Sequence, residues 1–81
     1  MTELSLQRMR ADVAGLLHEP PEAIGDEDNL MDLGLDSMRL MKLASRWREA
    51  GARLEFADLA AEATLARWWA LVQDRMASDP A

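Results

Sequence analysis

The stretch that decides the fold is residues 29–41, which read NLMDLGLDSMRLM. Gly34 suits the left-handed backbone conformation that ends a helical turn. The segment Asn29–Leu33 is therefore predicted to form a single turn, with Leu30 and Leu33 pointing inward. A tight connection follows it, and a long helix is predicted to begin directly afterwards.

That long helix is predicted to begin at Asp36 or Ser37 and to end before Gly51, a favourable residue just past a helix end. Ser37 then lies at a helix N-terminus, where unpaired N–H groups and the helix dipole favour a phosphate. A simpler interpretation is that Ser37 is only the helix cap, because serine is common there. Leu40 stands three residues later, so no capping box supports that interpretation.

Outward from this segment, apolar periodicity predicts four helices and no strands. Their ranges are about 3–17, 37–50, 56–62 and 65–77. Thr2, with Glu3 behind it, is the expected cap of the first helix, and Thr64 that of the last. The expected inward stripes are Leu6, Met9, Val13, Leu16 and Leu17; Leu40, Leu43, Ala44 and Trp47; and Leu65, Trp68 or Trp69, Val72 and Met76. A long acidic loop with one apolar anchor, Ile24, joins the first two long helices.

Composition narrows the class of protein. The chain has 81 residues, no cysteine and a net charge of −6, so we expect a single domain, residues 1–81, without thiolate metal sites. The acidic balance argues against nucleic acid, and no apolar run is long enough for a membrane span. With no signal-like segment, a cytoplasmic monomer is expected. His18 is the single histidine, and a serine–histidine enzyme would also need an orienting acid and an oxyanion hole, so neither catalysis nor metal binding is expected.

The charges are segregated along the chain. From His18 to Asp36 there are seven acidic residues and no Lys or Arg, whereas Ser37 to Arg48 holds four basic residues and no acidic one. Such blocks are equally compatible with solvated surfaces and with a docking surface for partners.

The tetrapeptide Gly34-Leu35-Asp36-Ser37, followed by an apolar residue and a long helix, resembles the attachment motif of carrier proteins. The resemblance covers nearly the whole chain. It implies an all-α four-helix bundle of the acyl-carrier-protein type, with three long helices, one short helix and a long first loop. It also implies that a phosphopantetheinyl transferase attaches 4′-phosphopantetheine to Ser37, with Gly34, Leu35 and Asp36 beside the arm.

Within that family, the chain is similar to the aryl carrier domains of siderophore-type nonribosomal peptide synthesis. The similarity rests on Met41, residues 44–48, residues 56–59 and the pair Trp68-Trp69. One departure is Ala61-Glu62-Ala63, where aryl carriers often have an Asn-Pro pair.

This resemblance implies a carrier that catalyses nothing itself. It would hold an aryl acid, such as salicylate or dihydroxybenzoate, as a thioester on its arm. An aryl-activating adenylate ligase would load the arm, and a condensation domain would take the acyl group. The arm would also bring the thiol that a chain without cysteine lacks. Two alternatives stay open: an acyl, aminoacyl or polyketide carrier, and an acidic helical adaptor without a prosthetic group.

The resemblance also implies partner-binding positions. Met38 and Met41 lie off the core stripe and would contact partner enzymes, for which adaptable methionine side chains are suited; peripheral core is the alternative. Arg39 and Lys42 would pair with acidic rims on partners.

On the short helix, Phe56 and Ala60 would face a condensation partner, although Phe56 could equally be a core residue. Core packing is the expected role of Trp47, in preference to gripping the cargo. Trp68 and Trp69 are adjacent and cannot both point inward, so at least one should be partly exposed.

Overall fold

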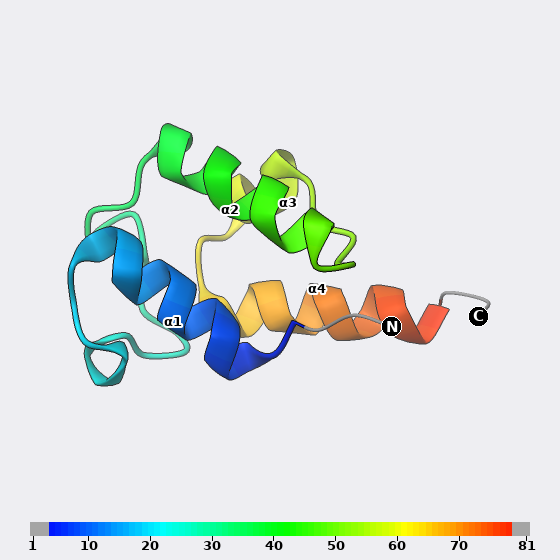
Figure 1. The fold of residues 1–81 in the computed structure, drawn as a ribbon, viewed down its shortest axis with the longest axis horizontal. Helices are drawn as coiled ribbons and strands as arrows, with labels where there is room; N and C mark the ends of the chain where they lie inside the picture. The colour runs from blue at the N-terminus through cyan, green and yellow to red at the C-terminus, as the bar shows by residue number, and fades with distance from the viewer. Residues whose placement is uncertain (1–3, 79–81) are drawn as a thin grey trace.

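The structure is a computed structural model that describes residues 4–78, with side chains described as far as residue 75. Its elements are α1 (Leu6–Leu17), a short 3₁₀ turn η1 (Pro21–Ala23), α2 (Ser37–Glu49), α3 (Phe56–Ala61) and α4 (Leu65–Ser78). Within these residues there is no strand. In Figure 1 the short α3 lies beside α2, and α1 and α4 form the other side of the bundle. The predicted all-α fold with three long helices and one short helix is confirmed.

The first helix begins later than predicted. Thr2 and Glu3 lie outside the described residues, and α1 starts at Leu6 with Ser5 as its N-cap. The Ser5 hydroxyl accepts a hydrogen bond from the Arg8 N–H at 3.1 Å. The start near residue 3 is therefore wrong, because a second capping residue lies further along the chain. The predicted Thr64 cap is confirmed: its hydroxyl accepts the Arg67 N–H at 3.2 Å.

Two tryptophans fill the centre of the bundle. Trp47 of α2 and Trp68 of α4 are both fully buried and meet edge to face, with ring centroids 5.6 Å apart. Such a pair contributes about 1 kcal/mol beyond the area that it buries. Trp69 is only partly buried, as its neighbour's burial requires. The core interpretation of Trp47 is thus confirmed. The predicted stripe of α2 is buried in full, namely Leu40, Leu43, Ala44 and Trp47.

An indole N–H links the first two long helices. Trp47 Nε1 donates to the Asp12 carboxylate at 2.9 Å, and Arg46 approaches the other Asp12 oxygen at 3.4 Å. A buried indole N–H needs such a partner, because an unpaired one costs about 1–3 kcal/mol. Apolar periodicity gave no sign of Asp12, since its role depends on a tertiary contact.

The long first loop is tied to the bundle at both ends. The Leu30 N–H donates to the Ala63 carbonyl at 2.9 Å, and the Ala66 N–H donates to the Asp26 carbonyl at 2.8 Å. The Asp26 carboxylate also pairs with Arg10 of α1. Buried Ile24 is the apolar anchor that the sequence predicted. These contacts fix the turn from which α2 starts.

That turn corrects one prediction. Leu30 is buried, but Leu33 is 43% exposed and does not point into the core. The inward position belongs to Leu35, whose side chain is buried and whose N–H donates to the Leu30 carbonyl at 3.1 Å. Gly34, with φ +119°, redirects the chain and so turns Leu35 inward in place of Leu33.

Candidate functional site

Ser37 is the first residue of α2, and its side chain is exposed. The helix cap is Asp36, whose Oδ1 accepts the Arg39 N–H at 2.9 Å. Leu35 is buried just before it and anchors the connection to the core. The interpretation of Ser37 as the cap is therefore wrong, because the capping bond belongs to its neighbour. The Ser37 hydroxyl has no hydrogen-bond partner anywhere in residues 4–78.

Arg39 supports the turn that leads to Ser37. Its Nη1 donates to the Gly34 carbonyl at 3.1 Å, while its backbone N–H is held by Asp36. The side chain thus spans the turn from the first coil of α2. The guanidinium already has a partner within the chain, so a role for Arg39 at a partner's acidic rim stays a prediction.

Other cations of α2 are also paired internally. Arg46 approaches Asp12 at 3.4 Å, and Arg48 approaches Glu55 at 3.7 Å. Lys42 is exposed, and no ion pair is recorded for it among the residues described. The basic block seen in the sequence therefore serves largely internal pairing.

Exposed apolar side chains occur on α2 just after Ser37 and also on α3. Met38 is 75% exposed and Met41 59% exposed, so neither belongs to the core. On α3, Phe56 is 38% exposed and Ala60 is exposed as well. The alternative that made Phe56 a core residue is wrong. Contact between these side chains and partners remains a prediction.

Two further exposed apolar residues were missed in the sequence. Met31 and Leu33, 42% and 43% exposed, lie on the turn before the motif. No local pattern indicated their exposure, because it depends on how Gly34 orients this turn against the core.

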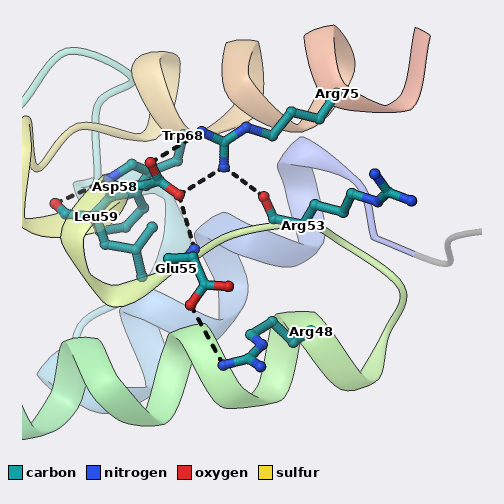
Figure 2. A network of polar contacts seen from close by, with 7 residues as sticks. All are labelled: Arg48, Arg53, Glu55, Asp58, Leu59, Trp68 and Arg75. Atoms are coloured by element: carbon teal, nitrogen blue, oxygen red, sulfur yellow. Dashed lines mark hydrogen bonds and ion pairs between the residues drawn. The ribbon is translucent and has the colours of Figure 1, made fainter. Parts of the chain in front are cut away.

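The far end of α2 has a different character, shown in Figure 2. Arg75 of α4 binds Asp58 of α3 through two hydrogen bonds, of 2.6 and 3.0 Å. The same guanidinium donates to the Arg53 carbonyl at 2.6 Å. Asp58 also accepts the Glu55 N–H at 2.9 Å, completing a capping box for α3. Trp68 Nε1 donates to the carbonyl of the adjacent Leu59 at 3.2 Å.

These contacts change the acidity of Asp58. The hydrogen bond from Arg75, followed by that from the Glu55 N–H, lowers the pKa of the Asp58 carboxyl from 3.8 to about 2. Both bonds favour the ionised carboxylate. This network joins α3, α4 and the α2–α3 connection, and its polar groups are partnered within the chain.

Other chemistry has little support in the described part of the chain. No group of three or more His, Cys, Asp or Glu side chains there could hold a metal ion. None of the described helices has the length and apolar character to cross a membrane. His18 is exposed at the C-terminal end of α1, with φ +58°, and no hydrogen bond between its ring and Ser37 is recorded.

A four-helix bundle with an exposed serine at the start of its second helix, where that serine does not act as the helix cap, has the features of a carrier domain. Comparison with known families agrees, because the family described as "Phosphopantetheine attachment site" matches residues 7–72. The chain belongs to this family, whose members carry covalent 4′-phosphopantetheine. The family predicted from the sequence is confirmed.

Individual relatives extend the comparison. Acyl carrier protein ScoB of Streptomyces coeruleorubidus is 40% identical over 72 residues, which is 89% of this chain and 85% of the relative. Phenyloxazoline synthase MbtB of Mycobacterium sp. (strain MCS) is 43% identical over 76 residues, 94% of this chain and 6% of that protein. Enterobactin synthase component B of Escherichia coli (strain K12) is 44% identical over 64 residues, 79% of this chain and 22% of that protein.

The chain thus spans most of one carrier protein but about a fifth or less of the two synthases. The matches to these synthases support the resemblance to carriers of siderophore-type synthesis that the sequence indicated. No solved structure matches the chain significantly.

Proposed function

We propose that Ser37 is the residue to which 4′-phosphopantetheine is attached, and that the chain is an aryl carrier protein. The observation that carries the proposal is the exposed Ser37 hydroxyl at the first position of α2, left without a capping bond because Asp36 caps the helix. A hydroxyl with no partner among the described residues is available for esterification.

The surroundings of Ser37 fit a phosphodiester. Within the described residues, no acceptor is recorded for the N–H groups of Ser37 and Met38. Unpaired N–H groups at the start of a 13-residue helix present partial positive charge to an anion. When bound, the arm supplies the thiol that a chain without cysteine lacks, so that an acid can be held as a thioester.

The aryl subtype is supported by the relatives. Two of them are named for the synthesis of a phenyloxazoline and of enterobactin. By the same likeness, the partners are a phosphopantetheinyl transferase, an aryl-activating adenylate ligase and a condensation domain. Met38 and Met41 would contact such enzymes beside Ser37, and Phe56 with Ala60 would contact the condensation partner. The chain would perform no catalysis of its own; its cytoplasmic location and monomeric state stay predictions.

The attachment test is intact-mass measurement after incubation with coenzyme A and a phosphopantetheinyl transferase of broad specificity. The wild type should gain one phosphopantetheine, and Ser37→Ala should gain none. Ser45→Ala is the matched control, since Ser45 is an exposed serine further along the same helix; it should be modified like the wild type. No gain on the wild type, or an equal gain on Ser37→Ala, would end the proposal.

A second candidate is a carrier of non-aryl acids, which the match to an acyl carrier protein over 85% of that relative favours. Loading the modified chain with a panel of ligases separates the two. Salicylate or dihydroxybenzoate should be the preferred cargo, and a clear preference for aliphatic, amino or polyketide acids would reject the aryl subtype. A chain that works unchanged as Ser37→Ala would instead be an adaptor without a prosthetic group.

A further inference from the structure

We infer that Arg39 is a positioning residue that holds the phosphate of the arm attached to Ser37. The inference rests on the proposed attachment at Ser37. Arg39 belongs to the first turn of α2, as Ser37 does, and it is half-buried. Its Nη1 donates to the Gly34 carbonyl at 3.1 Å, and Gly34 precedes Ser37 by three residues. The guanidinium therefore lies at the same end of α2 as the Ser37 hydroxyl.

The bond to Gly34 leaves most of the Arg39 guanidinium unused. The group has five N–H donors in a planar fork. No acceptor is recorded for its Nε and Nη2 atoms within residues 4–78. These two nitrogens form one edge of the fork, which is the arrangement that binds two phosphate oxygens at once. Arg39 can thus keep its bond to Gly34 while the free edge faces an anion.

Two hydrogen bonds hold Arg39 in place before any arm is attached. Its backbone N–H donates to Asp36 Oδ1 at 2.9 Å, and its Nη1 is held by the Gly34 carbonyl. A side chain that is already held loses little conformational entropy when it binds a second partner. Long side chains on a helix also lean toward its N-terminus, which is the end where Ser37 lies.

The charges around Ser37 favour a cation beside the phosphate. A phosphodiester on Ser37 adds one negative charge next to the Asp36 carboxylate, and like charges at neighbouring residues repel. Asp32 is exposed on the preceding turn, and no Lys or Arg occurs from residue 18 to residue 38. Arg39 is the first cation after the serine, so its guanidinium is best placed to offset the added charge. A phosphate held there fixes where the arm leaves the protein surface.

Lys42 is the next cation of α2 and offers a matched comparison. It is exposed, and no ion pair is recorded for it among the described residues. It lies three residues beyond Arg39, about 4.5 Å further along the helix axis. Its ammonium is a point charge without a fork of donors. We therefore expect the phosphate to be held by Arg39 and not by Lys42.

The test compares each variant of the full chain with and without the arm, so that any cost to the unmodified fold cancels. Intact mass first confirms that prolonged incubation with the transferase has modified every molecule. Attachment should then raise the midpoint of thermal unfolding by about 2–4 °C more in the wild type than in Arg39→Gln, as expected for one partly exposed ion pair. Lys42→Gln should respond to attachment as the wild type does. The wild-type excess over Arg39→Gln should shrink at high salt.

The phosphorus of the arm gives a second readout, which a purely structural role of Arg39 would not move. Its NMR signal should shift in Arg39→Gln and keep its wild-type position in Lys42→Gln. Arg39→Lys keeps the charge but lacks the fork, so it should fall between the wild type and Arg39→Gln in both measurements. In the wild type alone, the NMR signal of the Arg39 Nε–H should shift when the arm is attached.

The outcomes separate this inference from the proposed function. A wild type that never gains the arm would overturn the proposed attachment. A wild type that gains it, with an equal thermal response and an unmoved phosphorus signal in Arg39→Gln, would overturn the Arg39 contact alone. A response lost in Lys42→Gln and kept in Arg39→Gln would assign the phosphate to the lysine and show the inference to be wrong. Should Arg39→Gln fail to fold, a wild-type Arg39 Nε–H signal unchanged by attachment would overturn the inference by itself.

Discussion

The two ends of α2 differ in whether the polar side chains beside them are paired within the chain. At the far end, Arg48 pairs with Glu55, and Arg75 of α4 binds Asp58 of α3 through two hydrogen bonds (Figure 2). At the near end, the Ser37 hydroxyl has no recorded partner in residues 4–78 and lies among exposed methionines. The polar side chains around the C-terminal end of the helix are thus paired with one another, whereas the hydroxyl at its N-terminal end has no partner within residues 4–78.

This difference suggests that the groups that stabilise the fold and the group proposed for function lie at opposite ends of α2. Groups that are satisfied within the chain stabilise the bundle, and changing them should cost free energy of unfolding. An exposed hydroxyl such as that of Ser37 is solvated by water and adds little to stability, so it is available for the proposed attachment. Near Ser37, two hydrogen bonds hold the turn without using the Ser37 hydroxyl. Asp36 accepts the Arg39 N–H and so caps the helix, and the Arg39 side chain donates to the Gly34 carbonyl.

The largest expected effect is that of Trp68→Ala, in the centre of the bundle. Trp68 is fully buried, meets Trp47 edge to face and donates to the Leu59 carbonyl. Its removal should cost about 3–5 kcal/mol of unfolding free energy, enough to unfold much of a small domain. Trp69→Ala, at a partly buried neighbour, should cost clearly less. Urea denaturation followed by circular dichroism measures both, and equal costs would contradict this placement of the core.

Asp58→Asn should come next, with a cost of about 1–2 kcal/mol at neutral pH. The folded-state pKa of Asp58, about 2, lies below its ordinary 3.8. The unfolded chain therefore binds the proton more readily, and the stabilisation present above about pH 4 is lost as the pH falls toward 2. The variant should lack this part of the acid sensitivity.

Urea midpoints between pH 2 and 7 test this expectation. Glu49→Gln, at an exposed carboxylate on the end of α2, is the control and should keep the wild-type profile. If Asp58→Asn lost stability below pH 4 as the wild type does, the pair of Asp58 and Arg75 would contribute no net stability.

At the N-terminal end of α2, Asp36→Ala should lower the free energy of unfolding by about 1 kcal/mol, because it removes the side-chain acceptor that caps the helix. Asp32→Ala, at an exposed aspartate of the preceding turn, should change stability by no more than about 0.5 kcal/mol. Thermal melts of the two variants compare them directly. A larger loss for Asp32→Ala would mean that the cap has been assigned to the wrong residue.

The smallest stability effect should be that of Ser37→Ala, within about 0.5 kcal/mol of the wild type. An exposed first-turn serine without a capping bond contributes little to the folded state. The same substitution should abolish arm attachment, so stability and function separate at one side chain. A loss of 1 kcal/mol or more in denaturant titrations would show that the hydroxyl has a structural partner after all.

Much of this could be predicted from the sequence, because it depends on local signals. Periodicity predicted the four helices and the buried stripe of α2, and Gly34 predicted the turn before Ser37. The start of α1 was misplaced because Thr2 and Ser5 are both capping residues, and local rules do not choose between them.

The contacts between elements could not be predicted in this way. The bonds from Trp47 to Asp12 and from Arg75 to Asp58 join residues far apart in the chain, and no local pattern pairs them. The exposure of Leu33 depends on how the left-handed Gly34 orients the turn against the core. Ser37 is proposed as the attachment site because a helix start and a motif coincide there.

The most direct test of the central claim is to locate the arm by peptide mapping and tandem mass spectrometry on the modified chain. The chain has four serines, Ser5, Ser37, Ser45 and Ser78. The account predicts that the phosphopantetheine mass is found on the peptide containing Ser37 and on no other. A modification mapped to a different serine, or spread among several, would contradict it.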